Sequence, residues 1–103
     1  MGARIEVAKV GELASGDIKL VEADGNMIVL LNVGGELYAI DDECTHSACS
    51  LSDGSLEDDV IECPCHGAQF NIKTGDVQEG PANEPIPTYP VQVDGDTVYV
   101  SLP

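Results

Sequence analysis

Two short segments of this chain each combine cysteine with histidine, and they constrain its fold more than any other feature. The first is Cys44-Thr45-His46 and the second is Cys63-Pro64-Cys65-His66, with sixteen residues between them. Each segment offers one thiolate and one imidazole, so together they can present two sulfur and two nitrogen ligands to one metal centre. Ligands of these types suit zinc and iron–sulfur clusters. A fold that uses all four ligands must bring the two segments together.

Strand-like periodicity runs through the rest of the chain. Apolar residues alternate or run at strand length in segments 5–10, 18–22, 27–33, 36–40, 60–62, 69–72, 91–93 and 97–100, and we expect these to be strands. The pairs Asp24-Gly25, Gly34-Gly35 and Asp94-Gly95 lie between neighbouring segments and are typical of hairpin turns. No window of helical length carries a 3.6-residue apolar repeat, so we expect an all-β chain with minimal helix.

The size of the chain indicates one small domain. Its 103 residues include no tryptophan and only 4% aromatic residues, so the core must depend on Val, Ile and Leu. We expect an antiparallel base formed by residues 1–42 and 82–103, with a metal-binding unit at 43–81 inserted between them. The longest apolar stretch, 27–31, is too short to span a membrane. The first residues lack a secretory pattern, so we expect a cytoplasmic protein without a membrane partner.

The chain is strongly acidic. Nineteen Asp and Glu residues stand against four Lys and Arg residues, which gives a formal net charge of −15. Such a surface repels the phosphates of nucleic acid, so we expect no nucleic-acid partner. It suits steering toward positively charged proteins, and it suits equally a general solubility surface or adaptation to high salt. The runs Asp41-Asp42-Glu43 and Glu57-Asp58-Asp59 lie beside and between the ligand segments, which favours docking.

The ligand pattern, C-x-H followed by C-x-x-H, resembles that of the Rieske family, and of small bacterial Rieske-type ferredoxins in particular. The resemblance continues through residues 51–54, 67–70, 74–75, 80–81, 87–91 and 96–100. It implies that Cys44 and Cys63 bind one iron of a [2Fe–2S] cluster. His46 and His66 would then bind the other iron, which raises the potential of such a cluster. The implied fold is a Rieske-type stack of antiparallel sheets with a small inserted cluster-binding subdomain.

Other chemistries fit these residues less well. Zinc accepts two cysteines and two histidines, but its common order groups the cysteines first, and it leaves Cys49 and Cys65 unexplained. A cysteine hydrolase needs a metal-free Cys–His pair and a third orienting group, and nothing in the sequence marks one. A Rieske oxygenase needs further histidines for a mononuclear iron, whereas His46 and His66 are the only histidines in the chain. We therefore expect a carrier and not an enzyme.

Cys49 and Cys65 complicate the resemblance. In the Rieske subunits of cytochrome bc complexes these positions carry a disulfide that ties the ligand loops together, whereas many oxygenase ferredoxins lack the pair. The resemblance thus implies a disulfide, and two reduced thiols are the alternative because the cytoplasm keeps thiols reduced. Ala68 and Phe70 stand where respiratory Rieske proteins carry hydroxyls that donate to sulfur. Their absence predicts a low reduction potential.

The resemblance also implies a function. The chain would be a one-electron carrier, the ferredoxin component of a dioxygenase or monooxygenase system in aromatic hydrocarbon catabolism. Its partners would be a flavin-containing ferredoxin reductase and a terminal ring-hydroxylating oxygenase, and the carrier itself would be a monomer. Two alternatives stay open: a small Rieske subunit of a nitrite-reductase-type or arsenite-oxidase-type complex, and a redox-sensing module. Gly80-Pro81 is either a third loop over the cluster or an ordinary turn.

Overall fold

The computed structural model describes residues 3–43, 49–65, 67–79 and 84–102. This part of the chain is nearly all β, which confirms the expected fold class. Its strands are β1 (Ala3–Lys9), β2 (Ile18–Ala23), β3 (Asn26–Val33), β4 (Glu36–Asp41), β5 (Ser55–Glu57), β6 (Val60–Glu62), β7 (Gln69–Asn71), β8 (Val77–Glu79), β9 (Thr88–Tyr89), β10 (Val91–Asp94) and β11 (Thr97–Leu102). Two 3-10 turns, η1 (Val10–Glu12) and η2 (Leu51–Asp53), complete the elements.

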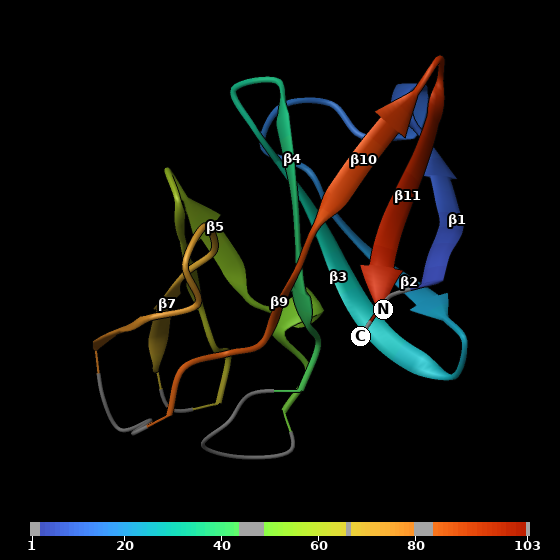
Figure 1. Cartoon of the computed structure of the whole chain (residues 1–103). Coiled ribbons are helices and arrows are strands. Elements are labelled where there is room, and N and C mark those ends of the chain that lie inside the picture. The colour runs from blue at the N-terminus through green and yellow to red at the C-terminus, as the bar shows by residue number, and fades with distance from the viewer. Residues whose placement is uncertain (1–2, 44–48, 66, 80–83, 103) are drawn as a thin grey trace.

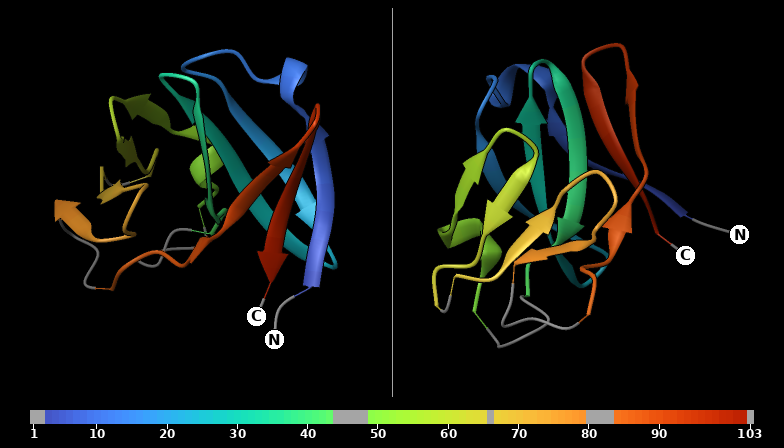
Figure 2. Two further views of the ribbon diagram at one scale, coloured as in Figure 1. Left: turned by 45° about the horizontal axis from the view of Figure 1, so that its top comes forward. Right: turned by 90° about the vertical axis from the view of Figure 1, so that its left-hand side faces the viewer.

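The strands form three antiparallel sheets. Their orders are β1-β11-β10, β2-β3-β4-β9 and β5-β6-β7-β8. Figure 1 shows β3 and β4 between the other two sheets, so the β2–β3–β4–β9 sheet is the middle layer. The first and last strands, β1 and β11, lie side by side in Figures 1 and 2 and are paired from Ala3 and Leu102 onward. In the described residues, no helix has the length and apolarity to cross a membrane.

Two tight turns build the middle sheet, as the sequence predicts. Gly34 and Gly35 join β3 to β4 with φ values of 62° and 95°, a conformation that costs glycine little. Asp24 and Gly25 join β2 to β3 with φ values of 52° and 84°. Both turns are two residues long, so each fixes the register of the strands that it connects.

Strand β3 separates two hydrophobic cores. Val29 and Leu31 face one core, whereas Ile28 and Leu30 face the other, and all four side chains are fully buried. The first, which we call the Cys63 core, contains Val29, Leu31, Ile40, Leu51, Ile61, Cys63, Ala68, Phe70, Ile72 and Ile86. The second, the base core, contains Ala8, Leu13, Val21, Ala23, Ile28, Leu30, Ala39, Val98, Val100 and Leu102. A strand buried on both faces explains the continuous apolar run in this part of the sequence.

Three short strands were not predicted, namely β5, β8 and β9. Each has only two or three residues and a single apolar side chain, so no apolar pattern marks it in the sequence. Val10 was expected at the end of the first strand but begins η1. The third sheet lies within residues 43–81, while the division of the chain into a base and an inserted unit stays a prediction.

Candidate metal centre

The structure describes three of the six predicted site residues. These are Cys49, Cys63 and Cys65. The other three, Cys44, His46 and His66, lie outside the described residues, as does the predicted third loop at Gly80-Pro81.

Asp42 holds together the two ends of the stretch that carries the first ligand segment. The Ser50 hydroxyl lies 2.6 and 2.7 Å from the two carboxylate oxygens of Asp42, and the Ser52 N–H donates to that carboxylate at 2.9 Å. The carbonyl of Asp42 accepts the N–H of Leu51 at 2.7 Å. Glu43 and Ser50 also form an antiparallel bridge. The residues that follow β4 and those that begin η2 are therefore held against each other.

Asp41 makes a separate contact with the last strand of the middle sheet. The Tyr89 hydroxyl donates to an Asp41 carboxylate oxygen at 2.5 Å, and the N–H of Asp41 donates to the Pro87 carbonyl at 3.0 Å. Burial, followed by the hydrogen bond to Asp41, raises the pKa of Tyr89 to about 12. Both Asp41 and Asp42 thus make contacts within the chain and are half-buried, and of residues 41–43 only Glu43 is exposed.

The second ligand segment begins at a closed turn between β6 and β7. The N–H of Cys63 donates to the Ala68 carbonyl at 2.7 Å, and the N–H of Gly67 donates to the Cys63 carbonyl at 3.2 Å. Gly67 has a φ of 76°, which a glycine adopts without strain. Cys63 lies at the base of this turn and is only 2% exposed, whereas Cys65 is exposed.

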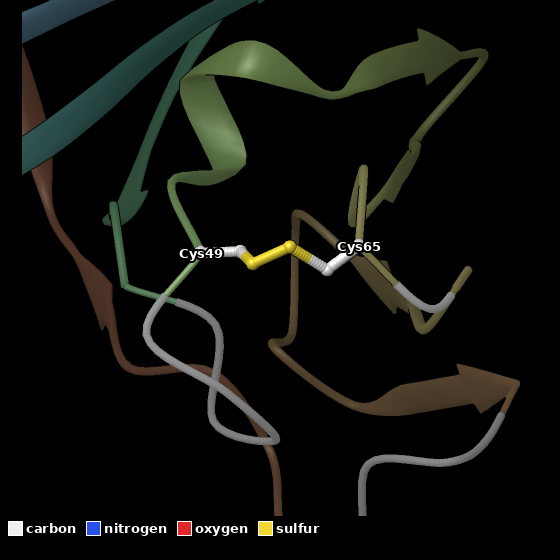
Figure 3. Close-up of a disulfide and its surroundings, with 2 residues drawn as sticks. All are labelled: Cys49 and Cys65. Carbon is white, nitrogen blue, oxygen red and sulfur yellow. A yellow bond between two sulfur atoms is a disulfide. The ribbon is translucent and has the colours of Figure 1, made fainter.

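A disulfide between Cys49 and Cys65 joins the two parts of the site. Figure 3 shows the side chain of Cys49, which lies just before η2, bonded to the side chain of Cys65 in the β6–β7 turn. Their Cα atoms are 6.3 Å apart, within the usual range for such a bond. Cys63 is then the free cysteine of the described residues. The sulfur atoms of all three cysteines lie within 4.8 Å of one another.

These donors suit the iron–sulfur centre that the sequence predicts. Cys63 offers a buried thiol at the base of a closed turn, and thiolates are the ligands that such clusters use. The disulfide removes two competing thiols. Ala68 and Phe70 are fully buried in the same core as Cys63, and neither carries a hydroxyl. An apolar surrounding of this kind controls solvent access and redox potential at a metal site.

Known proteins resemble this chain over nearly its whole length. The family model described as the Rieske [2Fe-2S] domain matches residues 3–90. The 3-phenylpropionate/cinnamic acid dioxygenase ferredoxin subunit of Escherichia coli (strain K12) is 44% identical over 101 residues, which are 97% of this chain and 94% of that protein. The structure of the Sphingomonas yanoikuyae B1 ferredoxin matches with a TM-score of 0.92 at 32% identity, covering 98% of this chain and 100% of that one. A chain from the complex of reduced oxygenase and oxidized ferredoxin in carbazole 1,9a-dioxygenase matches with a TM-score of 0.91 at 37% identity, covering 95% of this chain and 92% of that one.

Proposed function

This chain belongs to the Rieske [2Fe–2S] domain family, and we propose that it carries single electrons to a terminal oxygenase that hydroxylates aromatic rings. The observation that carries the proposal is the 44% identity, over 97% of the chain, to a protein named as a dioxygenase ferredoxin subunit. A match over 97% of this chain and 94% of that protein supports the same role, not only the same fold.

The ligand set that we propose is Cys44 and Cys63 on one iron, with His46 and His66 on the other. A [2Fe–2S] cluster held in this way takes up and releases one electron at a time. Cys63 supplies its thiolate from a buried position at the base of the β6–β7 turn. Asp42 fixes both ends of the stretch that carries the other cysteine. The Cys49–Cys65 disulfide, which we propose is present in the working protein, ties the two together.

Oxygen chemistry belongs to the partner. A mononuclear iron site of the oxygenase type uses two histidines and a carboxylate. The chain has two histidines in all, and the proposed cluster uses both. The chain can thus deliver electrons but has no histidine left for a second, oxygen-activating iron.

Two partners follow from this role. A flavin-containing ferredoxin reductase would supply electrons and the terminal oxygenase would accept them, with the carrier a cytoplasmic monomer between the two. The net charge of −15 supports docking to surfaces rich in Lys and Arg, because opposite fields raise the rate of encounter. The exposed carboxylate of Glu43 directly precedes the first ligand segment and is available for such docking.

Reconstitution tests the proposal. The purified, cluster-containing chain replaces the native ferredoxin subunit in a 3-phenylpropionate dioxygenase system that contains its own reductase and oxygenase. We expect NADH-dependent formation of hydroxylated product that requires this chain and scales with its concentration at low amounts. The Cys63→Ser variant is the control and should support none. If the chain is reduced by the reductase but the reduced chain is never reoxidised by the oxygenase, the proposed role is wrong.

A further inference from the structure

Three cysteine sulfurs meet beside the proposed cluster site. The Sγ atoms of Cys49, Cys63 and Cys65 lie within 4.8 Å of one another. We propose that reduction of the Cys49–Cys65 disulfide turns this group into a three-thiolate site for a thiophilic cation such as Zn²⁺ or Cd²⁺, and that the closed disulfide keeps the centre selective for the cluster. Cys63 would be a ligand both of this cation and of the cluster, so the bound cation excludes the cluster. That consequence rests on the function proposed above.

The three sulfurs lie close enough to converge on one small cation once the bond between Cys49 and Cys65 is broken. A Zn–S bond is about 2.3 Å long, so two sulfurs bound to one zinc lie at most about 4.6 Å apart. When the disulfide opens, the Cys49 and Cys65 sulfurs separate from bonding distance, and all three sulfurs start from within 4.8 Å of one another. Cys63 is held by backbone hydrogen bonds to Ala68 and Gly67, and Pro64, which has one fixed backbone angle, links it to Cys65. Two of the three thiolates are thus held close before a cation arrives.

The third thiolate comes from a part of the chain that is equally well fixed. Cys49 directly precedes Ser50, whose hydroxyl lies against the Asp42 carboxylate. Cys49 is half-buried and packs against the Cys63 core. Opening the disulfide therefore leaves Cys49 near the other two cysteines, since packing and hydrogen bonds hold its neighbours.

Charge around the group favours a cation. A hollow of about 410 Å³ beside Cys49 is lined by the carboxylates of residues 41–43. Another hollow, of about 340 Å³, runs along Cys63 and is lined by Asp53 and Glu62. Among the described residues, no Lys or Arg lines either hollow. These acidic residues attract a cation to the region, even though water screens the attraction.

Cys65 is the point at which the disulfide can be opened. It is exposed, whereas Cys49 is half-buried, so a dithiol reductant reaches the sulfur of Cys65 first. One reductant thiolate bonds to that sulfur and the bond to Cys49 breaks; the second reductant thiol then releases Cys65, so the reductant gives up two electrons and ends as a disulfide. The cation that binds next displaces the remaining thiol protons.

Cadmium titration of a cluster-free chain tests the site directly. The full-length Cys44→Ser variant lacks one proposed cluster ligand but keeps all three cysteines of the group. A phosphine opens its disulfide without adding thiols, and thiolate–Cd²⁺ absorption in the ultraviolet reports binding. We expect one Cd²⁺ per chain, bound at least about tenfold more tightly after reduction, since even the loss of a residue that supports a ligand costs that much in metal affinity. Adding Cys49→Ser should abolish the gain. Equal affinity before and after reduction would overturn the proposal.

The cluster-containing wild-type chain gives a second test that does not depend on that variant folding. Loss of the visible cluster absorption is followed with increasing Cd²⁺, with and without the phosphine. We expect the loss from the reduced wild type to accelerate with Cd²⁺ concentration. The Cys49→Ser chain lacks both the disulfide and the third thiol, so its loss should hardly respond to Cd²⁺. If it responds as strongly as the reduced wild type, the disulfide is only a tie and the proposal is wrong. A wild type without a cluster contradicts the proposed function and leaves the titration as the test.

Discussion

The carboxylate of Asp42 lies within 2.6 and 2.7 Å of the Ser50 hydroxyl, although the two residues are eight positions apart in the chain. The stretch between them contains Cys44, His46 and Cys49. A single side chain therefore ties together the two ends of the stretch that carries two proposed cluster ligands and one cysteine of the disulfide. We regard Asp42 as a positioning residue for the centre.

Replacing Asp42 should loosen the cluster. Asp42→Ala leaves the Ser50 hydroxyl with the Ser52 hydroxyl as its remaining partner. It leaves the partly buried Ser52 N–H without its acceptor, which costs about 1–3 kcal/mol. We expect faster loss of the visible cluster absorption on dilution into chelator, together with a lower free energy of unfolding. Asp42→Asn keeps one acceptor oxygen and should lie between Ala and wild type. Asp94→Ala, at an exposed turn, is the control; a similar loss there would remove any special role for Asp42.

The contact of Asp42 shows what the sequence could not predict. The hairpin strands and their turns were predictable, because apolar alternation and the Asp24-Gly25 and Gly34-Gly35 pairs are local signals. The Asp42 carboxylate was interpreted as surface charge that favours docking, and nothing local distinguishes it from Glu43. Only the fold brings Ser50 and Ser52 back against it.

The same limit applies to β9 and to the site. Thr88 and Tyr89 form a strand because they pair with Ile40 and Ala39 of β4, a contact across half the chain that their own two-residue pattern cannot reveal. The ligand types and their order were visible in the sequence, as was the family. The resemblance also implied that Cys49 and Cys65 meet in a disulfide, whereas the closeness of the Cys63 sulfur to both was not predictable, since spacing alone does not set the distance between sulfurs.

Docking should depend on the carboxylates that are exposed near the ligand segments. Asp41 and Asp42 are used internally, so the sharper test is the pair Glu43→Gln and Glu62→Gln. We expect a lower association rate with the oxygenase, and a weaker dependence of that rate on salt, because exposed charges act only within about 8–10 Å at moderate salt. Stopped-flow reduction of the oxygenase measures both.

The matched control is the pair Asp94→Asn and Asp96→Asn. These residues lie at the β10–β11 turn, at the far end of the molecule from the point where β4 ends (Figure 1). The control removes the same charge from another face, so an equal fall in rate for both pairs would assign the acidity to general solubility or salt adaptation.

Tyr89 should make stability depend on alkaline pH. Its pKa is raised to about 12 from 10.0, so the folded state holds the proton more tightly than the unfolded chain. The stabilisation is complete below pH 10 and is lost as the pH rises through about 12. Because the side chain is only partly buried, solvent screening limits the effect to about 1 kcal/mol. Urea unfolding at several alkaline pH values should show this fall in the wild type and in Tyr99→Phe, and a clearly smaller fall in Tyr89→Phe, in which the hydrogen bond to Glu36 still raises the pKa of Tyr38. A fall of undiminished size in Tyr89→Phe would assign it to other groups.

The absence of hydroxyls at Ala68 and Phe70 should set a low reduction potential. Hydrogen bonds to sulfur stabilise the reduced, more negative cluster, and the charge of −15 further opposes an added electron, so we expect a potential of roughly −150 to 0 mV.

The side chains of Ala68 and Phe70 are fully buried, so a hydroxyl introduced at either position must find a partner inside the core or cost about 1–3 kcal/mol. Ala68→Ser and Phe70→Tyr should raise the potential, because the new hydroxyls donate to sulfur. Phe70→Leu adds no hydroxyl and should not raise it. Protein-film voltammetry gives the potentials, and thermal unfolding reports whether the hydroxyls are satisfied. A wild-type potential above about +200 mV would place the chain with the respiratory Rieske proteins and contradict its role as an oxygenase ferredoxin.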